Sequence, residues 1–195
     1  MSQLSRRRFL GSAGATSLAA VSFPYLALGQ VSPNEKIRMG IIGCGGMGMG
    51  DLGAFLANPE VDFAVVCDVD DARMGNAADM VEAQRGHRPE MARDFRKVID
   101  RNDLDAVLVV TPDHWHALPT VFACQTGKDV YVEKPLARTI DEGRAIVEAT
   151  RQNKRVVQMG TQGKSSQHFA DAVAFVQSGK LGKVRMVRAW AYLDW

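Results

Sequence analysis

Short apolar runs alternate with longer amphipathic stretches along most of the chain. The short runs suit buried β-strands, and we predict strands over residues 36–42, 61–67, 106–110, 130–132 and 155–159. The stretches between them have helical spacing, and we predict helices over residues 47–57, 71–85, 95–101, 116–126, 139–153 and 165–178. Strands such as AVLVV are apolar throughout, which is typical of a sheet covered on both faces. The pattern therefore predicts an α/β fold built on a doubly wound parallel sheet.

The pattern changes at the C-terminal end of the sequence. Residues 183–195 (KVRMVRAWAYLDW) place apolar and aromatic side chains on alternate positions, which predicts one long strand of a different sheet. A lone edge strand can neither pair its backbone nor cover its aromatic side chains. We therefore expect a first domain over residues 30–160, followed over residues 161–195 by the start of a second, truncated α+β domain.

Residues 1–29 have the composition of an export signal. They contain Arg6, Arg7 and Arg8 and no acidic residue, followed by a weakly apolar stretch that ends in small residues. Paired arginines before Phe9 and Leu10 resemble the twin-arginine class, whose substrates cross the membrane folded. We expect the twin-arginine export machinery as a partner and a periplasmic location, with membrane tethering if the signal stays uncleaved. A membrane anchor is the alternative, disfavoured because Gly, Ser and Thr interrupt the stretch.

Composition and charge exclude several classes of protein. The 195 residues are 46% hydrophobic and 24% charged, so the chain can bury a core. The formal net charge is +2, which would fall by three to −1 without residues 1–29, and no later segment is a basic run. A nucleic-acid-binding surface is therefore not expected. Cys44, Cys67 and Cys124 are too few and too scattered for a disulfide framework or a zinc cluster.

A glycine-rich turn follows the first predicted strand. Residues 43–48 (GCGGMG) fit G-x-G-x-x-G and open the first predicted helix. Gly43 would permit the tight turn, Gly45 would let the backbone approach a pyrophosphate, and Gly48 would let the helix pack on the strand. The phosphates would rest on free amides at this helix end, which Gly46 and Met47 also supply.

An acidic residue follows this turn at the spacing that a dinucleotide site requires. Asp68 lies twenty residues after Gly48, at the end of the second predicted strand. A carboxylate there accepts hydrogen bonds from ribose hydroxyls and repels a 2′-phosphate, which favours NAD over NADP, with NADP the alternative cofactor. Asp68 could instead cap the following helix, as could Asp70 or Asp71.

Two polar clusters follow later strands. Residues 111–116 (TPDHWH) come after AVLVV, and residues 133–135 (EKP) come after DVYV; ligands bind at this carboxyl edge of a parallel sheet. His114 and His116 are only two imidazoles, so no metal site is expected. The ammonium of Lys134 would point into the crevice and could stabilise an alkoxide or transfer a proton, although a plain surface lysine is the alternative.

These motifs together resemble the glucose–fructose oxidoreductase, inositol dehydrogenase and rhizopine-catabolism (Gfo/Idh/MocA) family, with the likeness running over residues 36–195. The resemblance implies a Rossmann domain, with Lys134 as the catalytic residue near the nicotinamide and the reacting hydroxyl of a carbohydrate substrate. It implies a cis Lys134–Pro135 bond, and it adds four residues to the cofactor-binding candidates: Thr111, His116, Glu133 and Gln162. Asp113 stands where many members have Asn. Members continue into a second domain that supplies an Asp and a His and forms the oligomer interface, so the longer protein would be a homo-oligomer.

Three hypotheses for function follow from the sequence. The first is an NAD(P)-dependent oxidoreductase that acts on a secondary alcohol of a sugar, cyclitol or related carbohydrate. The second is an NAD-dependent glycoside hydrolase of the same family, in which oxidation is transient. The third is a truncated, catalytically inactive nucleotide-binding fragment. His168, on the last predicted helix, is expected to be solvated or to cap the helix, so the general base is left unassigned.

Overall fold

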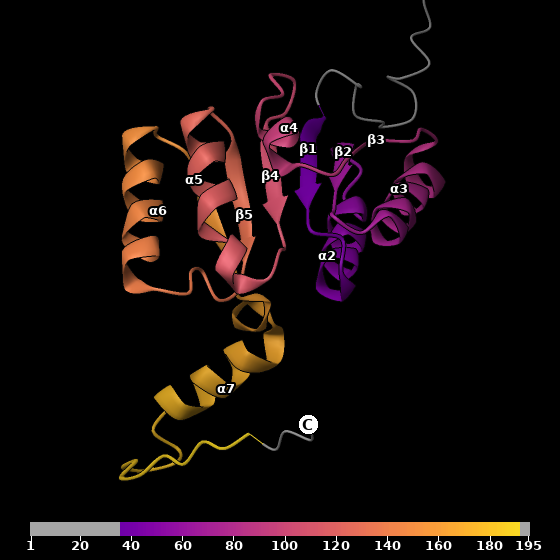
Figure 1. Ribbon diagram of the computed structural model, residues 1–195. Helices are drawn as coiled ribbons and strands as arrows, with labels where there is room; N and C mark the ends of the chain where they lie inside the picture. The colour runs from indigo at the N-terminus through magenta and orange to yellow at the C-terminus, as the bar shows by residue number, and fades with distance from the viewer. Residues whose placement is uncertain (1–35, 192–195) are drawn as a thin grey trace, which may run out of the picture.

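A parallel sheet of six strands organises residues 36–191, which are the residues that the computed structural model describes (Figure 1). The strand order is β3-β2-β1-β4-β5-β6, so the chain reverses direction across the sheet between β1 and β4. The strands are β1 (Ile37–Ile42), β2 (Val61–Cys67), β3 (Glu90–Ala92), β4 (Ala106–Val109), β5 (Asp129–Glu133) and β6 (Val157–Gly160). This order confirms the doubly wound α/β fold, and the reversal point is where such sheets bind ligands.

Helices cover the sheet on both faces and bury two separate apolar cores. They are α2 (Gly46–Leu56), α3 (Asp71–Arg85), α4 (Phe95–Ile99), α5 (Ala117–Gln125) and α6 (Ile140–Gln152), whereas a further helix, α7 (Gln167–Gln177), buries no residue. The first two cover one face, and α4, α5 and α6 cover the other. Side chains of β4 alternate between the two cores: Leu108 packs under α2 and α3, while Val107 and Val109 pack under α5. Burial on both faces explains why this strand is apolar throughout.

The elements between residues 36 and 178 match the sequence-based prediction closely. Each predicted strand and helix is present, with ends that differ by at most two residues. Thr139 caps α6 in a reciprocal capping box with Glu142, as expected from their spacing. The strand β3 was not predicted, because only one of its three residues is buried and it therefore leaves no apolar run.

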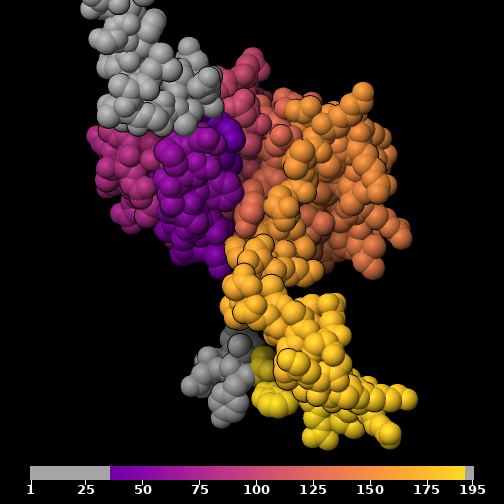
Figure 2. Space-filling view, turned by 180° about the vertical axis from the view of Figure 1, so that it is seen from behind, coloured from indigo at the N-terminus to yellow at the C-terminus, as the bar shows by residue number. Residues whose placement is uncertain are grey.

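The predicted strand over residues 183–195 is wrong for the part that the structure describes. Residues 183–191 are not strand, and Val187 and Trp190 are exposed. A strand exists only when it pairs with a neighbour, and no described segment lies along this one. The segment follows α7, which projects beyond the carboxyl edge of the sheet, away from both cores (Figures 1 and 2). The predicted export signal, residues 1–29, lies outside the described residues, and none of the described helices could cross a bilayer.

Candidate functional site

The glycine turn between β1 and α2 is closed by contacts that exclude any side chain at two positions. Gly43 has a φ of 99°, a left-handed conformation that favours glycine. A Cβ on Gly43 would lie 2.5 Å from the Val110 carbonyl oxygen, and one on Gly48 would lie 2.2 Å from the Gly43 carbonyl oxygen. The turn, the first helical turn of α2 and the end of β4 therefore touch through their backbones.

The opposite side of this turn is open. The first α-helical hydrogen bond of α2 runs from the Met49 amide to the Gly45 carbonyl at 2.8 Å, so the amides that precede Met49 have no helical acceptor. A Cβ on Gly46 would meet nothing within 4 Å, and one on Gly45 would meet only the Arg73 guanidinium at 3.7 Å. Exposed amides, a positive helix end and vacant space beside two glycines fit a pyrophosphate.

Asp68 connects the glycine turn to the end of β2. Its Oδ2 accepts a hydrogen bond from the Cys44 amide at 2.7 Å, and its Oδ1 accepts one from the Asp70 amide at 2.9 Å. Asp68 does not cap α3: the cap is Asp70, whose carboxylate accepts from the amides of Ala72 and Arg73. Each Asp68 oxygen retains a lone pair for a further donor, as binding of a ribose diol requires.

A cavity of about 520 Å³ joins these groups at the point where the strand order reverses. It contains the predicted site residues Gly43, Gly45, Gly46, Met47, Gly48, Asp68 and Thr111 in its lining. Phe95 and Trp115, packed edge to face at 5.9 Å, also line it. The Thr111 hydroxyl is buried and has no partner among the described residues, so it can bond a ligand. These features fit a dinucleotide.

His116 lies behind the cavity rather than in its lining. It is 2% exposed, its Nδ1 lies 2.6 Å from the Pro135 carbonyl oxygen, and its Nε2 lies 2.7 Å from the Thr111 carbonyl oxygen. A carbonyl only accepts, so both contacts are hydrogen bonds at once only when the ring carries both protons. The ring joins the loop after β4 to the loop after β5, where the Lys134–Pro135 bond is cis as the resemblance implies.

The remaining predicted residues form a second group at the ends of β5 and β6. Glu133 is buried, its Oε2 accepts a hydrogen bond from the Lys134 amide at 3.1 Å, and the Lys134 ammonium lies 3.6 Å away. Gln162 donates from Nε2 to the Glu133 Oε1. The Lys134 side chain is 55% exposed, so its ammonium lies near Glu133 and is accessible to solvent.

Asp51 of α2 joins this second group and was not predicted from the sequence. It is 7% exposed, and its Oδ1 lies 3.4 Å from Gln162 Nε2. Burial, followed by repulsion from Glu133, raises its pKa above the ordinary aspartate value. Burial and the same two carboxyl groups also raise the pKa of Tyr131 on β5. One signal in the sequence could have revealed Asp51. It lies three residues after Gly48, next to Leu52 on the buried side of the helix.

The thiols and imidazoles offer no further chemistry. Burial raises the pKa of Cys44 and of Cys67 to about 12, so both thiols stay protonated and unreactive at neutral pH. No group of three or more metal-binding side chains occurs within residues 36–191. His168 is exposed on α7.

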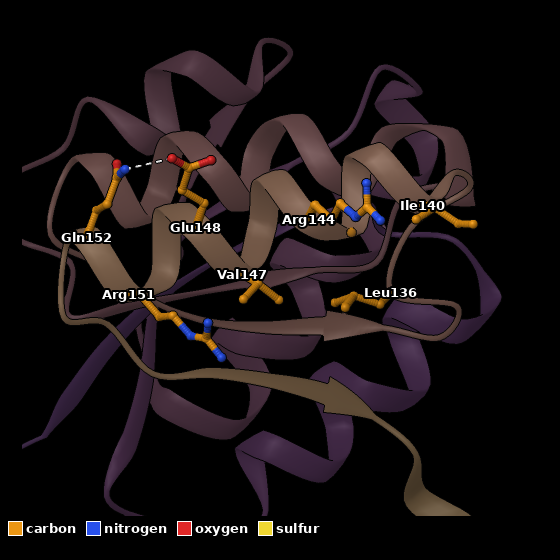
Figure 3. A pocket seen from close by; sticks show the side chains of 8 residues that line it. Leu136, Ile140, Arg144, Val147, Glu148, Arg151 and Gln152 are labelled. Atoms are coloured by element: carbon orange, nitrogen blue, oxygen red, sulfur yellow. Dashed lines mark hydrogen bonds between the residues drawn. The ribbon is translucent and has the colours of Figure 1, made fainter.

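A separate hollow on the outer face of α6 contains none of the predicted site residues. Its volume is about 600 Å³, and Figure 3 shows Leu136, Ile140 and Val147 along it with Arg144 and Arg151 beside them. Glu148 and Gln152 of the same helix bond each other at 2.8 Å. The hollow contains no residue of the glycine turn or of the Glu133–Gln162 group.

Comparison with known proteins agrees with this geometry. Residues 37–161 match the family model described as an oxidoreductase family with an NAD-binding Rossmann fold. The chain belongs to the Gfo/Idh/MocA family. The matched span runs from the first residue of β1 to the residue after β6, so the described sheet is the family's NAD-binding domain.

The similar proteins include two kinds of enzyme. A glycosyl hydrolase family 109 protein of Saccharopolyspora erythraea is 35% identical over 82% of this chain and 36% of its own length. An α-N-acetylgalactosaminidase of Shewanella oneidensis is 27% identical over 80% of this chain and 39% of its own. The structure of Lactobacillus casei scyllo-inositol dehydrogenase with NAD(H) and scyllo-inositol has a TM-score of 0.67 at 23% identity, covering 75% of this chain and 42% of that one. This chain thus spans less than half the length of the relatives that it matches.

Proposed function

We propose that this chain is the NAD-binding part of an enzyme that oxidises a secondary alcohol of a sugar, cyclitol or related carbohydrate. The observation that carries the proposal is the link made by His116, which ties Thr111 at the cavity to Pro135 beside Lys134. The loop that carries Lys134 is thereby tied to a cavity that fits a dinucleotide. Among candidate cofactors, NAD is favoured over NADP by the Asp68 carboxylate.

Different residues of the chain would have separate roles in this reaction. NAD, when bound, supplies a hydride acceptor. The amides at the start of α2 would hold the pyrophosphate, and Asp68 would hold the ribose diol. Lys134 would stabilise the developing alkoxide or move its proton, while Glu133 keeps the ammonium in place from 3.6 Å.

The substitution Lys134→Met tests the catalytic role. It removes the ammonium and keeps most of the length of the side chain, so in a form of the protein with measurable turnover we expect NAD affinity to persist and turnover on a panel of sugars and cyclitols to fall roughly 10²–10⁴-fold. Calorimetric titration measures the first and NADH formation the second. Lys97→Met, at an exposed position on α4, is the matched control. Unchanged turnover of Lys134→Met would refute the assignment.

Glycoside hydrolysis with transient oxidation is the second candidate function. It is favoured by the 35% identity to a glycosyl hydrolase family 109 protein. In that case the cofactor returns to its starting state in each cycle. Release of free sugar without a net change in NADH absorbance distinguishes it from the first function.

We also propose that residues 161–195 begin a second domain that completes the enzyme. The lengths of the relatives and the exposed apolar side chains of α7 support this. The 195-residue chain would then be an inactive nucleotide-binding fragment, and NAD binding without turnover in one sample would establish it. Export through the twin-arginine route to the periplasm is proposed from residues 5–10, and fusion of residues 1–29 to a reporter tests it.

A further inference from the structure

Asp51 is a buried carboxyl group at the carboxyl edge of the sheet, and it has no role in the function proposed above. Its side chain leaves α2 toward the end of β5, and only 7% of the residue is exposed. Oδ1 has one long contact, 3.4 Å from Gln162 Nε2, and Oδ2 has no partner among the described residues. An ionised carboxylate placed in this way would lack the donors that normally compensate for lost water.

Glu133 also contacts the side-chain amide of Gln162, and it has more hydrogen-bond donors around it than Asp51 has. It accepts from Gln162, accepts from the Lys134 amide at 3.1 Å, and has the Lys134 ammonium at 3.6 Å. Ionising both of two neighbouring buried carboxyl groups is costly, and ionisation is easier for the group that accepts more hydrogen bonds. Of the two, Asp51 is the carboxyl group with fewer donors to compensate for ionisation.

We propose that Asp51 is the protonated member of this pair and acts as a positioning residue, holding the Glu133 carboxylate through Gln162 and thereby orienting the Lys134 ammonium at the crevice. The orienting role rests on the proposed function, whereas the protonation of Asp51 does not. The arrangement couples the helix that begins at the glycine turn to the strand that ends at Lys134.

The electrostatics of the group agree with this placement of the proton. The charged or titratable side chains that face Asp51 are Glu133 and Tyr131 on β5 and Lys134 just after it. Burial and then Glu133 raise the pKa of Asp51, while Gln162 and the more distant Lys134 lower it by less. Unfolded aspartate has a pKa of about 3.9. Between that pH and the raised pKa, the unfolded state loses its proton first, so stability falls as pH rises.

The substitution Asp51→Asn measures the protonation state without any substrate. Asn mimics a protonated carboxyl group and does not titrate. The variant should therefore not lose stability at this position as the pH rises. We expect the difference in Tm between Asp51→Asn and the unsubstituted chain to grow by about 3–5 °C per pH unit as the pH rises above the unfolded aspartate pKa of about 3.9. Asp171→Asn, at an exposed position on α7, should give a difference that does not change over the same range.

Two controls keep this test decisive. In Glu133→Gln the repulsion is gone, so the Asp51→Asn difference should level off at a lower pH than it does with Glu133 present. A difference that does not grow as the pH rises above about 3.9 in the unsubstituted background would overturn the proposal. If Asp51→Asn does not fold, ¹³C-labelled aspartate side chains in the unsubstituted chain decide instead: a resonance that titrates above the ordinary aspartate range supports the proposal, and the absence of any such resonance overturns it.

Turnover then tests the orienting role separately. In a form of the protein with measurable turnover, Asp51→Ala should lower kcat at least tenfold at neutral pH, and Asp51→Asn should restore it. Equal kcat in Asp51→Ala and the unsubstituted protein would overturn the orienting role. If no form turns over, the proposed function fails, while the Tm and resonance measurements still decide the protonation of Asp51.

Discussion

Asp68 shows how one side chain can serve both the fold and a ligand. Its two hydrogen bonds to the amides of Cys44 and Asp70 fix the glycine turn against the end of β2 before any ligand arrives. The same carboxylate lines the cavity, and so do Arg73 and Arg93. The acid excludes a 2′-phosphate, whereas an arginine nearby can accommodate one. The proposed preference for NAD over NADP would therefore depend on the Asp68 carboxylate, which shares the cavity lining with two cations.

We predict that Asp68→Ala loses NAD affinity and gains relative affinity for NADP. Loss of charge-assisted hydrogen bonds, each of about 1.5–3 kcal/mol, should weaken NAD binding roughly 10–100-fold. Removal of the negative charge beside Arg73 and Arg93 should leave NADP binding unchanged or stronger. Calorimetric titration with both coenzymes measures the ratio. Asp68→Asn keeps an acceptor for the Cys44 amide, so it separates damage to the glycine turn from loss of cofactor recognition. A ratio of NAD affinity to NADP affinity that stays constant in both variants would contradict the prediction.

At the scale of elements, the sequence predicted what depends on local patterns. The strand AVLVV, the cap Thr139 and the glycine turn were all predicted because their own residues determine them. The strand over residues 183–191 was wrong because alternation of side chains does not supply a partner strand. Asp51 was missed for a related reason: the burial that gives it its chemistry comes from β5 and residue 162, far away in sequence.

Three of the four glycines of helix α2 differ in the expected effect of substitution. Gly48→Ala should destabilise the fold and abolish NAD binding, because its Cβ would lie 2.2 Å from a backbone oxygen. Gly46→Ala meets no protein atom within 4 Å, so it should keep stability and weaken NAD binding by filling the phosphate site. Gly50→Ala is equally open and lies farther along the helix, so it should add about 0.5–1 kcal/mol of stability and leave binding alone. Chemical denaturation and calorimetry measure both quantities, and normal NAD binding by Gly46→Ala would exclude a phosphate there.

At the scale of the whole molecule, the sheet domain and helix α7 differ in how much apolar surface they bury. The sheet and the helices α2 to α6 enclose two cores, whereas every residue of α7 is exposed. On α7, Phe169, Val173 and Val176 recur at the spacing of one helical face and are each about half exposed. A monomeric surface rarely leaves such a face uncovered. This face is where the proposed second domain would pack.

Replacing a valine by alanine in the sheet core and on α7 tests whether only the first region is buried. Val132→Ala removes methyl groups from a fully buried position and should cost about 2 kcal/mol of unfolding free energy. Val173→Ala removes them from the open face of α7 and should change the unfolding free energy of the 195-residue chain by less than about 0.5 kcal/mol. Urea denaturation of both variants gives the comparison. In a longer protein that contains the proposed second domain, Val173→Ala should become costly, because its methyl groups would then be buried. A large cost already present in the 195-residue chain would show that something other than a second domain covers α7.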